Sequence, residues 1–176
     1  MSEEFRWVAN RVRGMSDRDL LFMKIRDISL TTKDVIRLTP GEPDFNTPRF
    51  ICEAAKKALD EGYTHYVPSA GLPELREAIA DRLREDRGID VNPKSEIVVT
   101  IGGAEAIYLA LVATVNPGDE VLIPDPGYAF VYEPCVTLAG GRPVLVPFAE
   151  DEEGFKIDPE KIEKQITSRT KILMLN

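Results

Sequence analysis

The sequence predicts an α/β fold, in which an N-terminal helical arm precedes a mainly parallel sheet with helices on both faces. Before Glu96, apolar residues recur mostly at the spacing of helical turns. From Glu96 onward, short runs rich in Val, Ile and Leu alternate with segments of helical length. Because parallel strands need long crossovers that are usually helices, this second pattern favours a parallel sheet.

The first 35 or so residues are expected to form a separate helical arm. Its first helix is marked by an apolar stripe made of Phe5, Val8, Val12 and Met15. Ser16 with Asp19 resembles a capping box and would open a second helix that runs to about Asp27. Residues 34–38 are typical of a short strand.

Two further helices are predicted before the sheet. Thr47-Pro48 has the hydroxyl cap and first-turn proline that begin a helix, and Gly62 would end it after Glu61. A second helix would begin at Gly71-Leu72-Pro73 and end at Gly88.

Four strands are predicted in the second half, at residues 97–101, 121–123, 144–146 and 172–175. The helices between them are expected at residues 104–115, 128–139 and 159–166, the last with Asp158 as its cap. The sequence stops at Asn176, directly after the final strand, and the carboxyl end of a buried parallel strand is where such sheets bind ligands. We therefore expect sequence to continue beyond Asn176.

Composition excludes several classes of protein. The chain is 43% hydrophobic, which is enough to form a core. Its net charge of -8 disfavours binding to nucleic acid or to an anionic membrane. The two cysteines, Cys52 and Cys135, form no CxxC pair, so neither a disulfide framework nor a metal site is expected. Without a signal core or a long apolar run, the sequence predicts a cytoplasmic protein.

Two candidate binding segments follow predicted strands. Gly102-Gly103-Ala104-Glu105 lies where a strand leads into a helix, and backbone amides at a helix N-terminus bind phosphate. The alternative is a tight turn that needs glycine. The segment from Pro124 to Tyr128 follows the next strand, on the same rim, and its aromatic ring is suited to stacking on a flat ligand. The alternative is a turn followed by a core tyrosine.

Two other segments carry weaker signals. Gly41 to Phe45, with two prolines nearby, is read as a rigid structural loop rather than a mobile acid–base pair. His65 is the only histidine, and without a catalytic partner nearby in sequence it is expected at the surface or in packing.

Taken together, these segments resemble class I aminotransferases of fold type I, of the aspartate and aromatic aminotransferase kind. Residues 41–48 resemble the family's GEPDF-x-TP signature, and residues 66–79 its Y-x-x-x-x-G-x-x-x-L-R-x-A-I segment. Residues 103–106 resemble its cofactor turn, and residues 124–128 its P-x-P-x-Y loop. The four occur in the family's order. The resemblance implies the first half of a fold type I large domain, with residues 1–45 forming the arm and part of a small domain and residues 46–176 an incomplete cofactor-binding large domain.

The resemblance also implies pyridoxal 5′-phosphate as cofactor, and amino acids and 2-oxo acids as substrates. Gly103, Ala104 and Glu105 would hold the cofactor phosphate, and Tyr128 would stack on its ring. Tyr66 would reach the cofactor phosphate of a neighbouring subunit, which makes a homodimer with composite active sites. Gly41 would offer its backbone amide to the substrate carboxylate.

No catalytic residue is assigned, because the family's cofactor-bonding lysine usually follows a serine and this chain contains no Ser-Lys pair. The family's N-P-T-G segment and its carboxylate-binding arginines are also absent, so the chain alone is expected to be inactive. Two alternatives stay open: a lyase or synthase of the same fold, and a short non-catalytic protein that binds or dimerises. A third alternative is a nucleotide-binding domain. The last is disfavoured, because Gly102-Gly103 is not a G-x-G-x-x-G fingerprint.

Overall fold

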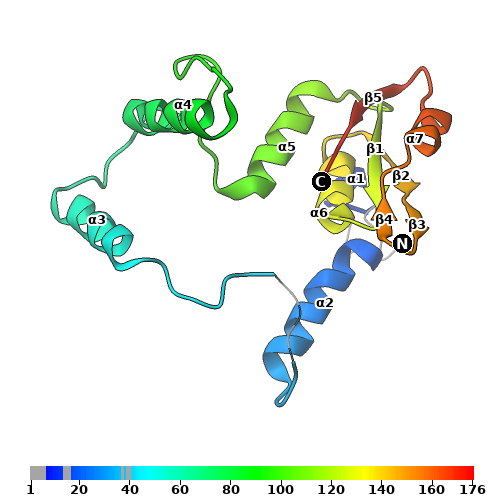
Figure 1. Cartoon of the computed structure of the whole chain (residues 1–176), viewed down its shortest axis with the longest axis horizontal. Helices are drawn as coiled ribbons and strands as arrows, with labels where there is room; N and C mark the ends of the chain where they lie inside the picture. Colours follow the sequence, from blue (N-terminus) through cyan, green and yellow to red (C-terminus); the bar gives the residue numbers. More distant parts are fainter. Residues whose placement is uncertain (1–6, 14–16, 37, 39–40) are drawn as a thin grey trace. The chain divides into compact units, whose positions relative to one another are not determined.

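The computed structural model describes residues 7–13, 17–36, 38 and 41–176. The chain divides into two compact units. One, here called the sheet unit, comprises Met1–Arg37 with Gly102–Asn176, and the other, the helical unit, comprises Leu38–Ile101. Figure 1 draws both units, whose positions relative to one another are not determined.

A three-stranded parallel sheet forms the centre of the sheet unit, in the order β2-β1-β5. Its strands are β1 (Glu120–Asp125), β2 (Arg142–Pro147) and β5 (Thr170–Leu173). The central strand β1 is buried from Glu120 to Pro124, as expected for a strand with a neighbour on each side. Its pairing with β5 shifts register between Glu120 and Val121.

The connections between the strands place helices on both faces of the sheet. Helix α6 (Ala129–Leu138) connects β1 to β2, and α7 (Pro159–Gln165) lies in the connection that returns from β2 past β1 to β5. The connection from β1 to β2 and the connection from β2 to β5 run in opposite directions across the sheet. Because both are right-handed parallel crossovers, their helices lie on opposite faces. Figure 1 shows α6 and α7 on opposite sides of the strands, so the predicted arrangement is confirmed.

The core of the sheet unit lies between β1, α6 and α5 (Gly102–Thr114). Its buried residues are Leu111, Val115, Val121, Ile123, Tyr132 and Val136. Alternate residues of β1 face this core because side chains of a strand alternate in direction. Each buried aliphatic side chain contributes roughly 1.5–3 kcal/mol to folding, so this cluster fixes α5 and α6 against the central strand.

The N-terminal helices are grouped with the sheet unit. Helices α1 (Asn10–Arg13) and α2 (Asp17–Thr31) both contact α6. The chain thus begins with helices ahead of the parallel sheet, as predicted, and the division into residues 1–45 and 46–176 stays a prediction. Phe5, Met15 and Ser16, which belong to the predicted stripe and capping box, lie outside the described residues.

The helical unit contains α3 (Arg49–Asp60) and α4 (Pro73–Arg87). Helix α4 begins with proline at its first position and ends at Gly88 in the left-handed conformation, as predicted. Helix α3 ends before Gly62, which has a φ of 83°. The predicted hydroxyl cap at Thr47 is wrong, because Pro48 takes the capping position and no side chain bonds to the first turn.

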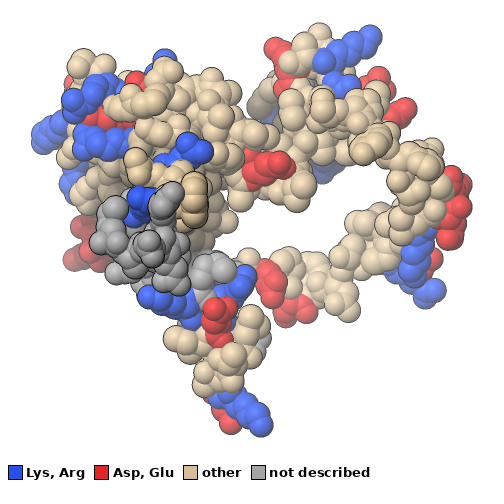
Figure 2. Space-filling view, turned by 180° about the vertical axis from the view of Figure 1, so that it is seen from behind, with Lys and Arg blue, Asp and Glu red and all other residues tan. Residues whose placement is uncertain are grey.

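The surface carries acidic and basic side chains intermixed, as Figure 2 shows. On α3, Glu53 lies 3.1 Å from the Lys56 ammonium and 3.8 Å from the Arg49 guanidinium, and Lys57 lies 3.6 Å from Glu61. Such exposed pairs one helical turn apart contribute about 0.3–0.5 kcal/mol each. The charged face of this helix is therefore a solvated surface.

Two predicted strands are not formed by the described residues. Among the described residues, residues 97–101 form no strand, and the Val99 amide donates to the Ala70 carbonyl at 3.0 Å. Val98 and Ile101 are exposed. Residues 34–38, of which 37 is not described, also form no strand. An apolar run becomes a strand only where it forms a ladder with another strand, and among the described residues neither segment is part of a sheet.

An antiparallel hairpin that the sequence analysis did not predict follows β2. It consists of β3 (Ala149–Asp151) and β4 (Gly154–Lys156). The Asp151 carboxylate accepts a hydrogen bond from the Glu153 amide at 2.9 Å, and Gly154 takes a φ of 111° that favours glycine. In the part of the chain that is described, no helix is long and apolar enough to span a membrane.

Candidate functional site

The carboxyl ends of the parallel strands define the candidate site. Strand β1 leads through a cis Asp125-Pro126 bond and Gly127 into Tyr128, which caps the start of α6. The Phe148 amide donates to the Asp125 carbonyl at 2.9 Å, so the end of β1 is tied to the residue that follows β2. In open α/β sheets, ligands bind outside this edge, which is where the sequence analysis placed the segment from Pro124 to Tyr128.

Tyr128 presents a partly open aromatic ring at this edge. Its side chain is 41% exposed, which contradicts the alternative of a buried core tyrosine. Phe130 and Tyr132 contact its ring in T-shaped arrangements, with ring centroids 4.7 Å and 5.4 Å away. Two aromatic neighbours thus restrain the ring while part of its surface stays accessible to a ligand.

The first turn of α5 has the features expected of an anion site. The helix begins at Gly102, which takes a φ of 76°, and a Cβ at either Gly102 or Gly103 would meet no atom within 4 Å. Gly103 and Ala104 lie in the first turn, where backbone amides have no acceptor within the helix. Glu105 comes next, at the position where the intrahelical hydrogen bonds begin. Phosphate binding by Gly103, Ala104 and Glu105 stays a prediction, as does the convergence of this turn with Tyr128 in one crevice.

The other predicted site residues belong to the helical unit. A Cβ at Gly41 would meet no atom within 4 Å, and Tyr66 is fully exposed. His65 is also exposed, as expected for a residue without a catalytic partner. Since the placement of this unit against the sheet unit is not determined, the roles of Gly41 and Tyr66 stay predictions.

Tyr132 is a residue of the site region that the sequence analysis did not single out. Its side chain is 7% exposed, and its hydroxyl donates a hydrogen bond to the Asn176 Oδ1 atom at 3.0 Å. The available signal was its spacing: Tyr132 follows Tyr128 by four residues, which places both on one face of a helix. It thus links α6 to the segment that follows β5.

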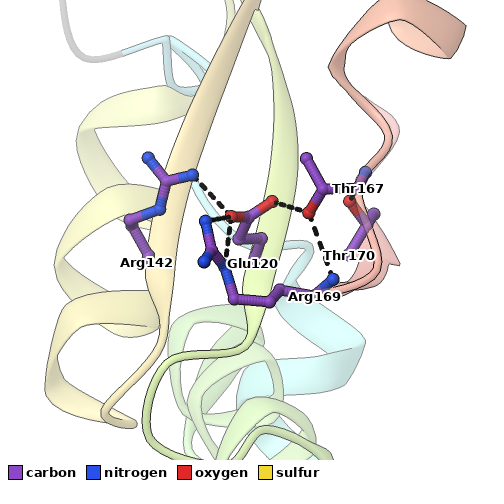
Figure 3. A network of polar contacts seen from close by, with 5 residues as sticks. All are labelled: Glu120, Arg142, Thr167, Arg169 and Thr170. Atoms are coloured by element: carbon purple, nitrogen blue, oxygen red, sulfur yellow. Dashed lines mark hydrogen bonds and ion pairs between the residues drawn. The ribbon is translucent and has the colours of Figure 1, made fainter.

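A buried carboxylate, Glu120, lies at the opposite end of β1. Figure 3 shows how side chains from the other two strands and the loop before β5 surround it. Glu120 Oε1 lies 2.5 Å from Arg142 Nη2 and 2.8 Å from Arg169 Nη2, and its Oε2 accepts from the Thr167 hydroxyl at 2.7 Å. This cluster joins all three strands at their amino ends.

The surroundings of Glu120 also change its acidity. The hydrogen bond from Arg142 is the largest cause, followed by that from Thr167, and together with Arg169 they lower the pKa of Glu120 to about 2. The side chain is fully buried, so its charge is compensated by its partners rather than by water. Both carboxylate oxygens are engaged and the group lies at the amino edge, which indicates a structural tie and not a catalytic acid.

Sequence comparison gives one consistent family. The model of the family "Aminotransferase class I and II" matches residues 33–176. The chain is 48% identical to the aspartate aminotransferase of Pyrococcus abyssi over 168 residues, which cover 93% of this chain and 43% of that protein. It is 43% identical to the aromatic-amino-acid aminotransferase 2 of Thermococcus litoralis over 153 residues, covering 87% of this chain and 39% of that protein.

Solved structures agree with the sequence comparison. The N-succinyldiaminopimelate aminotransferase of Mycobacterium tuberculosis matches with a TM-score of 0.84 and 33% identity, over 94% of this chain and 42% of that chain. The aromatic aminotransferase of Pyrococcus horikoshii matches with a TM-score of 0.75 and 47% identity, over 85% and 39%. The chain thus spans about two fifths of the length of these relatives. Because the family model matches well over half of its residues, the chain belongs to the class I and II aminotransferase family.

Proposed function

We propose that the protein transfers an amino group between an amino acid and a 2-oxo acid with the aid of pyridoxal 5′-phosphate. The observation that carries this proposal is the restrained, partly exposed ring of Tyr128 at the carboxyl end of the buried central strand. A flat aromatic cofactor is a suitable ligand for such a ring, because offset stacking adds about 0.5–1.5 kcal/mol to the burial of its area. The family of the chain supports this choice of cofactor.

The start of α5 suits the other end of the same cofactor. The amides of Gly103, Ala104 and Glu105 would hold the phosphate, and the open space at Gly102 and Gly103 lets an anion approach the backbone. When bound, pyridoxal phosphate supplies the electron sink for chemistry at the α-carbon, and the protein supplies orientation and electrostatics. The residues of this chain would therefore bind and orient the cofactor rather than move protons.

Catalysis in the family also needs a lysine that bonds covalently to the cofactor. These 176 residues contain no Ser-Lys pair and no N-P-T-G segment. The proposed activity therefore concerns the protein to which these residues belong, and the 176-residue chain by itself is proposed to be inactive.

A homodimer with composite active sites is part of the same proposal. The full exposure of Tyr66 supports its proposed contact with the cofactor phosphate of a partner subunit. The open backbone at Gly41 supports an amide contact with the substrate carboxylate. We propose a cytoplasmic location for this dimer, consistent with the two cysteines being unpaired.

The activity can be tested by following labelled nitrogen. The full-length protein, saturated with pyridoxal 5′-phosphate, is incubated with a ¹⁵N-labelled amino acid, either aspartate or an aromatic one, and with a 2-oxo acid. The proposal predicts ¹⁵N in the amino acid formed from the 2-oxo acid, detected by mass spectrometry. Release of the label only as ammonia, or no transfer from any of these donors, contradicts the proposal.

The role of Tyr128 is tested by binding. Replacing Tyr128 with leucine should weaken cofactor binding about 2- to 10-fold, since stacking contributes about 0.5–1.5 kcal/mol. Tyr63→Leu is a matched control, because Tyr63 is an exposed tyrosine of the other unit. Equal affinities of the two variants contradict the stacking role.

A further inference from the structure

Tyr132 contacts two residues at the carboxyl edge at once. Its ring lies against that of Tyr128, with centroids 5.4 Å apart and planes at 76°. Its hydroxyl donates to Asn176 Oδ1 at 3.0 Å, across 44 residues of sequence. Tyr128 stands at the end of β1, whereas Asn176 follows β5, so one side chain of α6 connects the ends of two neighbouring strands.

The surroundings of Tyr132 make this connection rigid. The side chain belongs to the core cluster with Ile123 and Val136, and Met174, two residues before Asn176, packs against that cluster. The Met174 amide also donates to the Leu122 carbonyl at 3.0 Å, which extends the pairing of β5 with β1 toward the edge. Because a ring in a close-packed core has little freedom to move, it also restricts the side chains that contact its edge and its hydroxyl.

We propose that Tyr132 is a positioning residue of the cofactor site, an inference that rests on the proposed function. Its ring restrains the stacking ring of Tyr128, and its hydroxyl fixes the carboxamide of Asn176. Because the Oδ1 atom of Asn176 accepts from Tyr132, the amide orientation is set, and the nitrogen of the carboxamide faces away from Tyr132. The position and orientation of both edge residues thus depend on Tyr132, which itself touches neither cofactor nor substrate.

A phenylalanine would fill the same core volume, so the hydroxyl is the part of Tyr132 that packing does not require. This hydroxyl donates to Asn176 at the edge. Loss of a neutral hydrogen bond that supports a binding site can weaken ligand binding about 2- to 10-fold. Removing the hydroxyl should therefore loosen Asn176 without opening a cavity.

The test is a double-mutant cycle in the full-length protein. Tyr132→Phe, Asn176→Ala and the double variant are compared with wild type for two properties: the dissociation constant of pyridoxal 5′-phosphate and the visible circular dichroism of the bound cofactor. The circular dichroism reports how firmly the cofactor ring is oriented, which a loss of stability alone does not change. Tyr63→Phe serves as the control, since Tyr63 is exposed and lies in the helical unit.

Each single variant is expected to weaken cofactor binding about 2- to 10-fold and to reduce the visible circular dichroism. The double variant should be no weaker than the worse single variant, because the two side chains act through one hydrogen bond. Unchanged affinity and circular dichroism in Tyr132→Phe, or a double variant whose loss equals the product of the two single losses, overturns the inference. If wild type itself binds no pyridoxal phosphate, the proposed function fails instead, so the two failures are distinguishable.

Discussion

Among the described glycines of the sheet unit, Gly141 has the closest neighbours for an added methyl group. A Cβ at this glycine would lie 2.7 Å from Val115 Cγ1, 3.1 Å from Val136 Cγ1 and 3.3 Å from the Asp119 carbonyl oxygen. The two valines are buried at the junction of α5, α6 and β1. Neighbours on three sides cannot all move away, so Gly141→Ala overpacks the core that holds α5 and α6 in place.

The size of the effect follows from this geometry. Overpacking a well-packed core costs about 1–3 kcal/mol. With a urea dependence of about 2 kcal/mol per molar, typical of small proteins, the unfolding midpoint should fall by about 0.5–1.5 M. The assay is urea unfolding followed by far-ultraviolet circular dichroism. Gly41→Ala is the control, since its Cβ meets no atom within 4 Å, and its free energy of unfolding should stay within about 0.5 kcal/mol of wild type or rise slightly.

A rescue variant tests the assigned cause. Val115→Ala removes the methyl nearest the new Cβ and by itself costs about 2 kcal/mol, from lost burial and the space left behind. In the double variant the alanine at 141 fills part of that space, so the loss should be smaller than the sum of the single losses by about 1 kcal/mol. An unchanged midpoint for Gly141→Ala, or strictly additive losses, would refute this account of the core.

Three further predictions concern Glu120, Asp158 and the isolated chain. The pKa of Glu120 is lowered from its ordinary 4.5 to about 2, so the stability from its ionised form is complete above about pH 5 and is lost as the pH falls toward 2. As the pH falls through this window, the thermal unfolding temperature of wild type should therefore decrease more steeply than that of Glu120→Gln. Parallel plots of unfolding temperature against pH would contradict the assigned network. The Asp158 side chain accepts hydrogen bonds from the first turn of α7, so Asp158→Ala should lower the free energy of unfolding by about 1 kcal/mol in a urea titration, whereas no change would remove the cap assignment. When the 176-residue chain is mixed with pyridoxal phosphate and borohydride, mass spectrometry should find no single lysine modified stoichiometrically, because no Ser-Lys pair is present; one such lysine would show that this chain carries the missing group.

Features determined by local chemistry were predictable from the sequence. Asp158 caps α7 with proline at the first helical position, and Gly88 ends α4 in the left-handed conformation. In both cases the deciding interactions lie within a few residues of each other. The buried run of β1 was predictable for a related reason, since a strand with neighbours on both sides is apolar throughout.

Features that depend on distant partners were not predictable. The run at 97–101 has the composition of a strand, yet it pairs with none among the described residues, and composition cannot supply a partner. Glu120 reads as a solvated acid beside Asp119, because Arg142 and Arg169 lie 22 and 49 residues away. Tyr132 was missed for the same reason, since its partner Asn176 adjoins another strand. The four family segments located the candidate site, but which of them meet in space depends on how the units are placed.

The most direct test of the central claim is the affinity of the full-length protein for pyridoxal 5′-phosphate when one amide of the α5 turn is removed. Ala104→Pro deletes a backbone donor in the first turn, where a helix tolerates proline best, and leaves the rest of the helix intact. Since a hydrogen bond to a charged group contributes about 1.5–3 kcal/mol, the dissociation constant should rise roughly 10- to 100-fold. Glu105→Ala, which trims a side chain and keeps the amide, should weaken binding far less. If Ala104→Pro is folded and binds the cofactor as tightly as wild type, the start of α5 is not the phosphate site and the account of this chain as part of a cofactor cradle is wrong.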